Sequence, residues 1–198
     1  MQIISKQKII TISLLAALMA ATPVSAQQKT WDYVQISHVA ENPDNDSSKW
    51  QGLAATFSTE LSDKWFIGAE FNQLDRNQDS NAKLQTLEFH GGRYTSLTDT
   101  SNGYWQVGLT QQHYSHPVWG LGDYSDKAWF VNARGGMVFM ATDALELNGF
   151  VEYQHATDSD YKSDWLVGVQ ARYYVNPAFS LQASYSTDAV TFGAAYHF

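Results

Sequence analysis

The chain has 198 residues and no cysteine, and its 20 acidic residues outnumber its 12 basic residues, which gives a formal charge of −8. This acidic balance argues against nucleic acid as a partner. The lack of cysteine excludes disulfides, thiol catalysis and cysteine-ligated metal in this chain, and we expect neither a cofactor nor a metal site.

Residues 1–26 have the pattern of a secretory signal peptide. Lys6 and Lys8 precede an uncharged run at 9–21, and the small residues Val24 and Ala26 predict cleavage after Ala26. The run is too short to cross a bilayer as a helix, which takes about 20 residues. An uncleaved amphipathic helix or membrane anchor is the alternative. The sequence therefore predicts a leader at 1–26 followed by one exported domain at 27–198.

Segments that alternate apolar and polar residues follow the leader. Successive side chains of a strand point to opposite faces, so this alternation predicts β-strands. Their lengths suit the tilted strands of a membrane barrel, in which about 9 to 11 residues cross the bilayer. We expect ten strands, at 30–40, 49–61, 64–74, 83–96, 103–115, 127–140, 144–156, 164–175, 179–186 and 189–198.

Short and long connections alternate between these segments. Tight turns rich in Ser, Thr, Asp, Asn and Pro are expected at 61–64, 97–102, 140–143 and 176–178. More polar and mostly longer loops are expected at 41–48, 75–82, 116–126 and 157–163, with a minimal turn at 187–188. Outer-membrane barrels have short periplasmic turns and longer extracellular loops. An even number of strands then places both termini in the periplasm.

The bulkier apolar residues share one face of each segment, which we expect to contact lipid, with aromatic residues near the strand ends as interfacial girdles. The expected fold is therefore all-β, an antiparallel up-and-down transmembrane β-barrel with ten strands, or eight as the alternative. The lipid-facing set includes Val34, Ile36, Leu53, Phe57, Trp65, Ile67, Phe71, Leu87, Phe89, Trp105, Val107, Leu109, Trp129, Val131, Met137, Phe139, Leu147, Val151, Trp165, Val167, Val169, Phe179, Leu181 and Tyr185.

The opposite faces are mostly polar and would line the lumen. A barrel of about eight strands is filled by its own side chains, whereas 16 to 18 strands leave an aqueous channel. We expect a hydrated ion-pair network, because an unpaired lumen charge costs several kcal/mol; a narrow solute path through the same interior is the alternative. Arg93 departs from the pattern and is expected to snorkel near the periplasmic interface. The predicted network consists of Glu70, Glu88, His90, Arg134, Glu146, Glu152 and Arg172.

The last ten residues alternate up to a terminal aromatic residue, with Phe192, Tyr196 and Phe198 on one face. Together with residues 31–34, the Ser/Thr-Asp turns and residues 171–176, this ending resembles the small outer-membrane β-barrel family of Gram-negative bacteria, the opacity-like or OmpA-like barrels.

The resemblance implies that Phe192, Tyr196 and Phe198 are a signal for the outer-membrane insertion machinery. It also implies location in the outer membrane, contact with its lipid and lipopolysaccharide, and a structural, adhesive or porin-like role without enzymatic activity. We expect a monomer. We do not expect peptidoglycan anchoring, which OmpA-type proteins carry in a separate periplasmic domain.

One enzymatic alternative rests on His113 and Ser115, with Asp123 in the following loop. A His that activates a Ser and is oriented by a carboxylate is typical of an acyl hydrolase. The spacing is similar to the His-x-Ser motif of outer-membrane lipid A deacylases, although those enzymes continue with Asn where this chain has His116. Because the alternation points His113 and Ser115 towards lipid, they are otherwise ordinary interfacial polar residues.

The remaining acidic loop residues predict a solvated rim. Ten-stranded omptin proteases need paired Asp and Asp/His sites there, but this chain does not match their motifs. The run at 42–46 lacks the Gly and the distant Glu of an EF-hand. Divalent ions that bridge the loops to lipopolysaccharide, and contacts of Trp119 or Tyr124 with a host or phage partner, are further alternatives. The rim residues are Asp44, Asp46, His155, Asp158 and Asp160.

Overall fold

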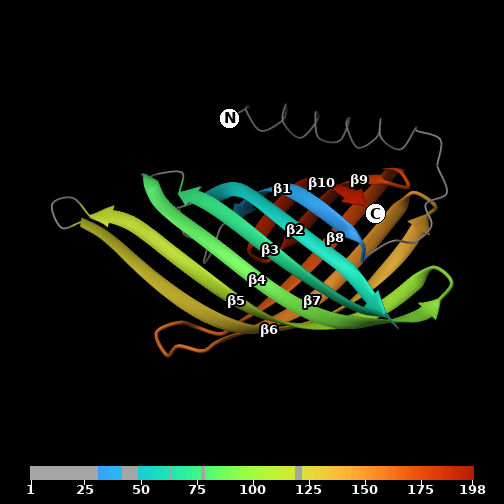
Figure 1. Ribbon diagram of the computed structural model, residues 1–198, viewed down its shortest axis with the longest axis horizontal. Coiled ribbons are helices and arrows are strands. Elements are labelled where there is room, and N and C mark those ends of the chain that lie inside the picture. Colours follow the sequence, from blue (N-terminus) through green and yellow to red (C-terminus); the bar gives the residue numbers. More distant parts are fainter. Residues whose placement is uncertain (1–30, 42–48, 63, 77–78, 119–121) are drawn as a thin grey trace, which may run out of the picture.

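The computed structural model describes residues 31–41, 49–62, 64–76, 79–118 and 122–198, with the side chains of 79–81, 117, 118, 122 and 123 left out. The described residues form ten antiparallel strands in a closed barrel (Figure 1). No helix within these ranges is long and apolar enough to cross a membrane. The strands are β1 (Tyr33–Glu41), β2 (Trp50–Ser62), β3 (Trp65–Arg76), β4 (Asp79–Thr98), β5 (Ser101–Val118), β6 (Gly122–Thr142), β7 (Leu145–Ala156), β8 (Asp164–Asn176), β9 (Phe179–Ser186) and β10 (Ala189–His197).

The first and last strands close the barrel. β1 pairs with β10 so that Tyr33 lies opposite His197 and Val34 lies opposite Tyr196. Phe198 then stacks on Phe57 of β2, with 6.2 Å between the ring centroids. Every other strand pairs with its neighbours in the sequence. The prediction of a ten-stranded antiparallel barrel is therefore confirmed, and the eight-stranded alternative is wrong.

The predicted tight turns are present, and each pairing beside them contains a register shift, between residues 60 and 62, 96 and 98, 140 and 142, and 174 and 176. Such bulges increase the local twist and end the strand pairing. Asn176 Oδ1 accepts hydrogen bonds from the backbone N–H groups of Ala178 (2.9 Å) and Phe179 (3.0 Å). We call this end of the barrel the turn end and the opposite end the loop end.

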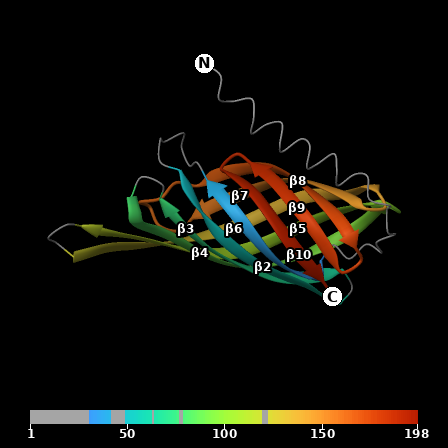
Figure 2. The same cartoon turned by 90° about the horizontal axis from the view of Figure 1, so that it is seen from above.

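Two of the predicted loops are wrong. Most of 75–82 and 116–126 belongs to β3, β4, β5 and β6, and the pairing continues as far as Val118 opposite Gly122. The resulting β5–β6 hairpin projects beyond the other strands (Figures 1 and 2). Outside the barrel wall neither face of a strand needs to be apolar, so polar composition does not distinguish strand from loop there. The predicted leader and the loop at 42–48 lie outside the described residues.

The two faces of the wall have inverted polarity compared with a soluble barrel. Large apolar side chains cover the outside, where Ile36 is 68% exposed and Trp165 is 62% exposed. The interior holds polar and charged side chains, among them Glu146 and Glu152, each 1% exposed. The predicted assignment of faces is therefore confirmed.

Candidate functional site

An aromatic cluster fills the lumen at the turn end. Trp31, which precedes β1, stacks on Phe66 with 4.0 Å between centroids and meets Tyr104 edge-on at 5.3 Å. A Cβ built on Gly136 would lie 2.6 Å from the Tyr104 ring, so this inward glycine makes room for the cluster. The aromatic plug, as we call it, consists of Trp31, Phe66, Tyr94, Tyr104, Val138 and Phe150.

Asp32 holds the plug in place. Its Oδ1 accepts hydrogen bonds from the Thr59 hydroxyl (3.0 Å) and from the backbone N–H of Glu60 (2.8 Å). The Glu60 carboxylate in turn accepts a hydrogen bond from the Tyr94 hydroxyl at 2.9 Å. The residues before β1 are thereby attached to β2, which is itself joined to β4, and the indole of Trp31 is directed into the lumen.

Two ion pairs lie in the lumen, one carboxylate on each side of Phe150 along β7, and each pair joins register partners on neighbouring strands. Arg134 Nε donates to Glu152, and the Arg134 guanidinium lies 4.6 Å from the centroid of the Phe150 ring. Arg172 Nη1 lies 3.4 Å from Glu146 Oε1. Pairing across adjacent strands explains how Glu146, Glu152 and Arg172 remain buried, because a buried charge needs a close counter-charge and further hydrogen bonds.

Polar neighbours complete the second pair. Tyr174 donates a hydrogen bond to Glu146 Oε2 at 2.9 Å, and Arg172 Nη2 donates to Gln182 Oε1 at 3.0 Å. The alternation places Tyr174 and Gln182 on the same inner face as Arg172. Tyr174 was absent from the predicted network, and only its position two residues after Arg172 indicates its role.

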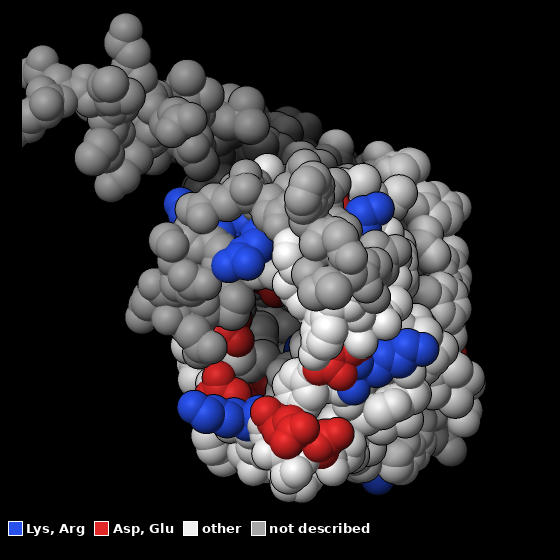
Figure 3. Space-filling view, turned by 90° about the vertical axis from the view of Figure 1, so that its left-hand side faces the viewer, with Lys and Arg blue, Asp and Glu red and all other residues white. Residues whose placement is uncertain are grey.

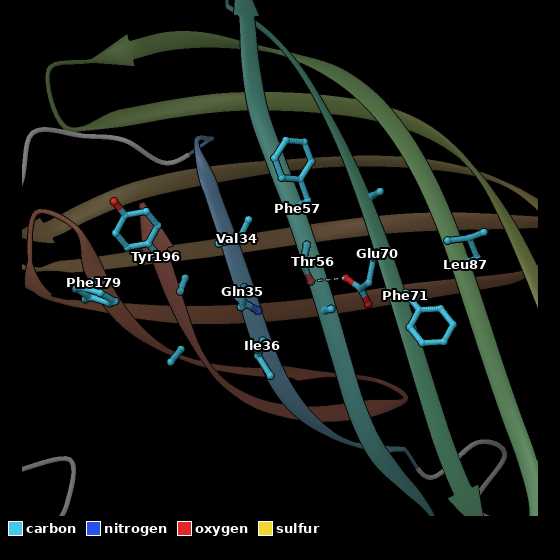
Figure 4. Close-up of a pocket in the computed structure, with 14 residues that line it drawn as sticks. Val34, Gln35, Ile36, Thr56, Phe57, Glu70, Phe71, Leu87, Phe179 and Tyr196 are labelled. Carbon is cyan, nitrogen blue, oxygen red and sulfur yellow. Dashed lines mark hydrogen bonds between the residues drawn. The ribbon is translucent and has the colours of Figure 1, made fainter. Parts of the chain in front are cut away.

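A second polar group contains two carboxylates side by side. Glu70 of β3 and Glu88 of β4 are register partners. Glu88 lies 3.0 Å from His90 Nδ1 and accepts hydrogen bonds from Thr110 (3.2 Å) and Asn132. Glu70 accepts a hydrogen bond from Thr56 at 3.3 Å (Figure 4). The structure therefore arranges the predicted network as two ion pairs and an acidic group.

Apolar side chains also line the lumen near the loop end. Trp50 packs edge-on against Tyr114, with 6.0 Å between centroids, and the Arg76 guanidinium lies 5.9 Å from the centroid of the Trp50 ring. Acidic and basic side chains surround a recess on this face (Figure 3). The buried residues of this loop-end cluster are Val39, Trp50, Ala54, Leu74 and Ala82. Hydrophobic clusters thus lie in the lumen near both ends of the barrel.

The structure does not assemble the hydrolase candidates. His113 and Ser115 share the outer face of β5, but in the described part of the structure no hydrogen bond joins their side chains. Asp123, whose side chain lies outside the described part, pairs with Pro117, which is about 13 Å along β5 from His113. Asp126 points inwards, where it accepts a hydrogen bond from Tyr161. The expected triad is therefore not brought together.

The rim candidates are likewise dispersed. Asp44, Asp46 and Trp119 lie outside the described residues. His155 Nδ1 lies 3.1 Å from the Ser163 hydroxyl, and Asp158 accepts a hydrogen bond from the backbone N–H of Asp160. Within the described ranges, no group of three His, Asp or Glu residues is arranged to hold a metal ion.

The predicted assembly signal lies on the outside of the barrel. Phe192, Tyr196 and Phe198 are all exposed, and the Tyr196 ring lies 5.2 Å from that of Phe179. Beside them a shallow apolar groove of about 560 Å³ crosses β1 to β4, β9 and β10 (Figure 4). Alanines such as Ala55, Ala69 and Ala194 lie in the groove, between larger side chains that include Phe57, Phe71, Phe179 and Tyr196.

Several solved structures are similar to this fold. Neisserial surface protein A has 12% identity and a TM-score of 0.49, over 84% of this chain and 96% of that one. The KdgM porin has 9% identity and a TM-score of 0.49, over 84% and 99% of the two chains. Ail, the attachment invasion locus protein of Yersinia pestis, has 12% identity and a TM-score of 0.47, over 85% and 97%. No protein-family model and no curated protein matches the sequence.

Proposed function

We propose that the protein is an integral outer-membrane β-barrel with a structural or adhesive role and without enzymatic activity. The inverted polarity of the wall carries this proposal. A soluble protein rarely exposes an apolar surface that encircles it, whereas a bilayer stabilises such a belt and the closed barrel leaves no strand edge in lipid. The turn end then faces the periplasm and the loop end faces outwards, because short turns are periplasmic in such barrels.

The packing of the lumen favours a structural or adhesive role over a narrow channel. A solute would have to pass the aromatic plug, the Arg134–Glu152 and Arg172–Glu146 pairs and the loop-end cluster. Moving any of these groups breaks packing or exposes a buried charge, which is costly. We therefore expect the resting barrel not to conduct.

The β5–β6 hairpin supports an adhesive role. Residues 122–129 of β6 pair with β5, whereas the pairing of β6 with β7 begins only at Phe130. The paired strands of the hairpin therefore extend beyond the barrel wall at the loop end (Figure 1). A projecting hairpin of this kind presents side chains and a strand edge to partners outside the cell.

Fractionation and electrophoresis test the membrane assignment. We expect the protein in the outer-membrane fraction, with a folded form that migrates differently from the boiled form on a gel. Recovery as a soluble periplasmic protein would overturn the architecture.

Conductance measurements test the channel alternative. In planar bilayers we expect no openings above background, and defined single-channel openings of the wild type would instead establish the channel alternative.

The adhesive role needs a separate test. A variant in which residues 116–124 are replaced by Asn-Gly, a favoured two-residue hairpin turn, is expected to keep the heat-dependent gel shift but to lose adherence of the expressing bacteria to a cell monolayer. Equal adherence of both forms would leave only the structural role.

The hydrolase alternative is tested by the composition of lipid A. Identical lipid A mass spectra from wild-type and Ser115→Ala cells are expected, and a difference in acylation would restore this alternative.

A further inference from the structure

We propose that the lipid face at the turn end carries a binding site for the headgroup phosphate of an anionic phospholipid, formed by Arg93 between Trp65 and Trp105. The inference rests on the proposed location in the outer membrane. It concerns the outside of the wall, away from the lumen groups described above.

The three side chains form one row across neighbouring strands. Trp65 of β3 is the register partner of Arg93 of β4, and Arg93 is also the register partner of Trp105 of β5. The Arg93 guanidinium lies 5.6 Å from the centroid of the Trp65 ring, and the two indole rings meet edge-on with 5.6 Å between centroids. Trp65 is 42% exposed and Trp105 is 47% exposed. The row therefore presents a cation with an aromatic wall on the lipid side.

The described residues supply no counter-charge for Arg93. Among the described residues no carboxylate forms an ion pair with the Arg93 guanidinium, which lies over the Trp65 ring. A cation on the lipid face is unfavourable unless it reaches the interface and finds an anion there. A guanidinium binds phosphate through two parallel hydrogen bonds, so a headgroup phosphate fits this position.

A second cation lies at the same interface. Lys64 immediately precedes Trp65 in the β2–β3 turn, and its backbone C=O accepts a hydrogen bond from the Tyr94 N–H next to Arg93 at 3.0 Å. The Lys64 ammonium lies 3.4 Å from the Ser96 hydroxyl and is exposed. The alternation places Ser96 on the inner face of β4, so the Lys64 ammonium is directed away from Arg93, and Arg93 supplies the charge of the row.

Glycines beside the row leave room for an acyl chain. Gly91 lies two residues from Arg93 on the outer face, and Gly135 is the register partner of Trp105. A Cβ on Gly91 would meet nothing closer than 3.7 Å, and one on Gly135 nothing closer than 3.9 Å. At the inward Gly92, by contrast, it would lie 2.3 Å from a backbone oxygen. Internal packing therefore requires glycine at 92 but not at 91 or 135. At 91 and 135 the missing side chains leave the outer surface of the wall recessed.

The position selects one source of phosphate. In the proposed orientation the row lies in the periplasmic leaflet, opposite the leaflet that contains lipopolysaccharide. A free phosphate ion has no acyl chain that could contact the recessed surface at Gly91 and Gly135. An anionic glycerophospholipid matches both Arg93 and this surface.

Native mass spectrometry of the folded full chain in neutral detergent tests the site, with phosphatidylglycerol and phosphatidylcholine of identical acyl chains as probes. Because one basic residue near a membrane surface contributes about 1 kcal/mol, wild type should retain the anionic lipid about fivefold better. Arg93→Gln should abolish the preference, and Arg93→Lys should keep part of it. Arg76→Gln is the matched control, because Arg76 also lies over an indole ring, that of Trp50, but at the loop end.

The outcomes separate this inference from the proposed function. An unchanged preference in Arg93→Gln, verified as folded by its gel shift, would overturn the site, as would displacement of the lipid by millimolar inorganic phosphate. Retention of neither lipid by a wild-type protein that fractionates as soluble would instead overturn the membrane assignment itself.

Discussion

The indole ring of Trp31 stacks on the phenyl ring of Phe66, with 4.0 Å between the centroids and 15° between the planes. Trp31 precedes the first strand and Phe66 belongs to the third. A residue that belongs to none of the strands therefore fills part of the barrel interior. Asp32 secures this arrangement through its hydrogen bonds to β2. The stacking links the closure of the turn end to the stability of the whole barrel.

Removal of the Trp31 ring should destabilise the barrel. Trp→Ala in a core costs about 3 to 5 kcal/mol, and since Trp31 is only partly buried we expect about 2 kcal/mol for Trp31→Ala. Urea unfolding in lipid vesicles, followed by the gel shift, measures this change. Trp31→Phe should recover most of the loss because a ring remains to stack on Phe66. A midpoint unchanged by Trp31→Ala would show that the plug contributes no stability.

The buried Arg172–Glu146 pair should be strongly coupled. Glu146→Gln leaves the Arg172 charge without its carboxylate, and breaking such a pair costs about 3 to 5 kcal/mol. The double variant Glu146→Gln/Arg172→Met removes both charges and should be less destabilised than Glu146→Gln alone. A double-mutant cycle on urea unfolding gives the coupling free energy. Strictly additive effects would contradict the pairing.

Two glycines on the neighbouring strands β7 and β8, one facing the lumen and the other facing outwards, provide a matched test of lumen packing. A Cβ on the inward Gly168 would lie 2.3 Å from the Phe150 ring, whereas one on the outward Gly149 would meet nothing within 4 Å. Overpacking typically costs about 1 to 3 kcal/mol, so we expect that loss for Gly168→Ala. Gly149→Ala should change the unfolding free energy by less than about 0.5 kcal/mol. Equal effects of the two substitutions would contradict the assignment of faces.

The contact between Tyr161 and Asp126 should depend on pH. The hydrogen bond to the Asp126 carboxylate, together with burial, raises the pKa of Tyr161 to about 12. Because the ordinary value is about 10, the contact contributes fully below pH 10 and is lost as the pH rises through the raised pKa. The ultraviolet absorbance of the phenolate, as a difference between wild type and Tyr161→Phe, measures this pKa. Asp126→Asn should lower it, and an unshifted titration in wild type would contradict the contact.

The sequence predicted the strands within the wall far better than those beyond it. Alternation around Val34, Trp105 and Val167 identified both the strands and their outer faces, because one face contacts an apolar medium. At 116–126 this constraint ends, and the hairpin pairing that continues there left no apolar pattern to detect. The hydrolase candidates are not brought together for a related reason, since the spacing of His113 and Ser115 is local but the position of a carboxylate depends on the register between β5 and β6.

The lumen shows the same division. The inward orientation of Arg134, Glu152, Arg172 and Glu146 follows from a side-chain period of two residues, a local property that the sequence by itself determined, as it did the number of strands and the aromatic ending. Which carboxylate meets which guanidinium was decided only by the tertiary structure, because a slip of one residue in strand pairing turns every side chain to the other face. The positions of Trp31 inside the barrel and of Arg93 in one row with Trp65 and Trp105 likewise follow from strand register and closure, which bring together residues that are distant in the chain.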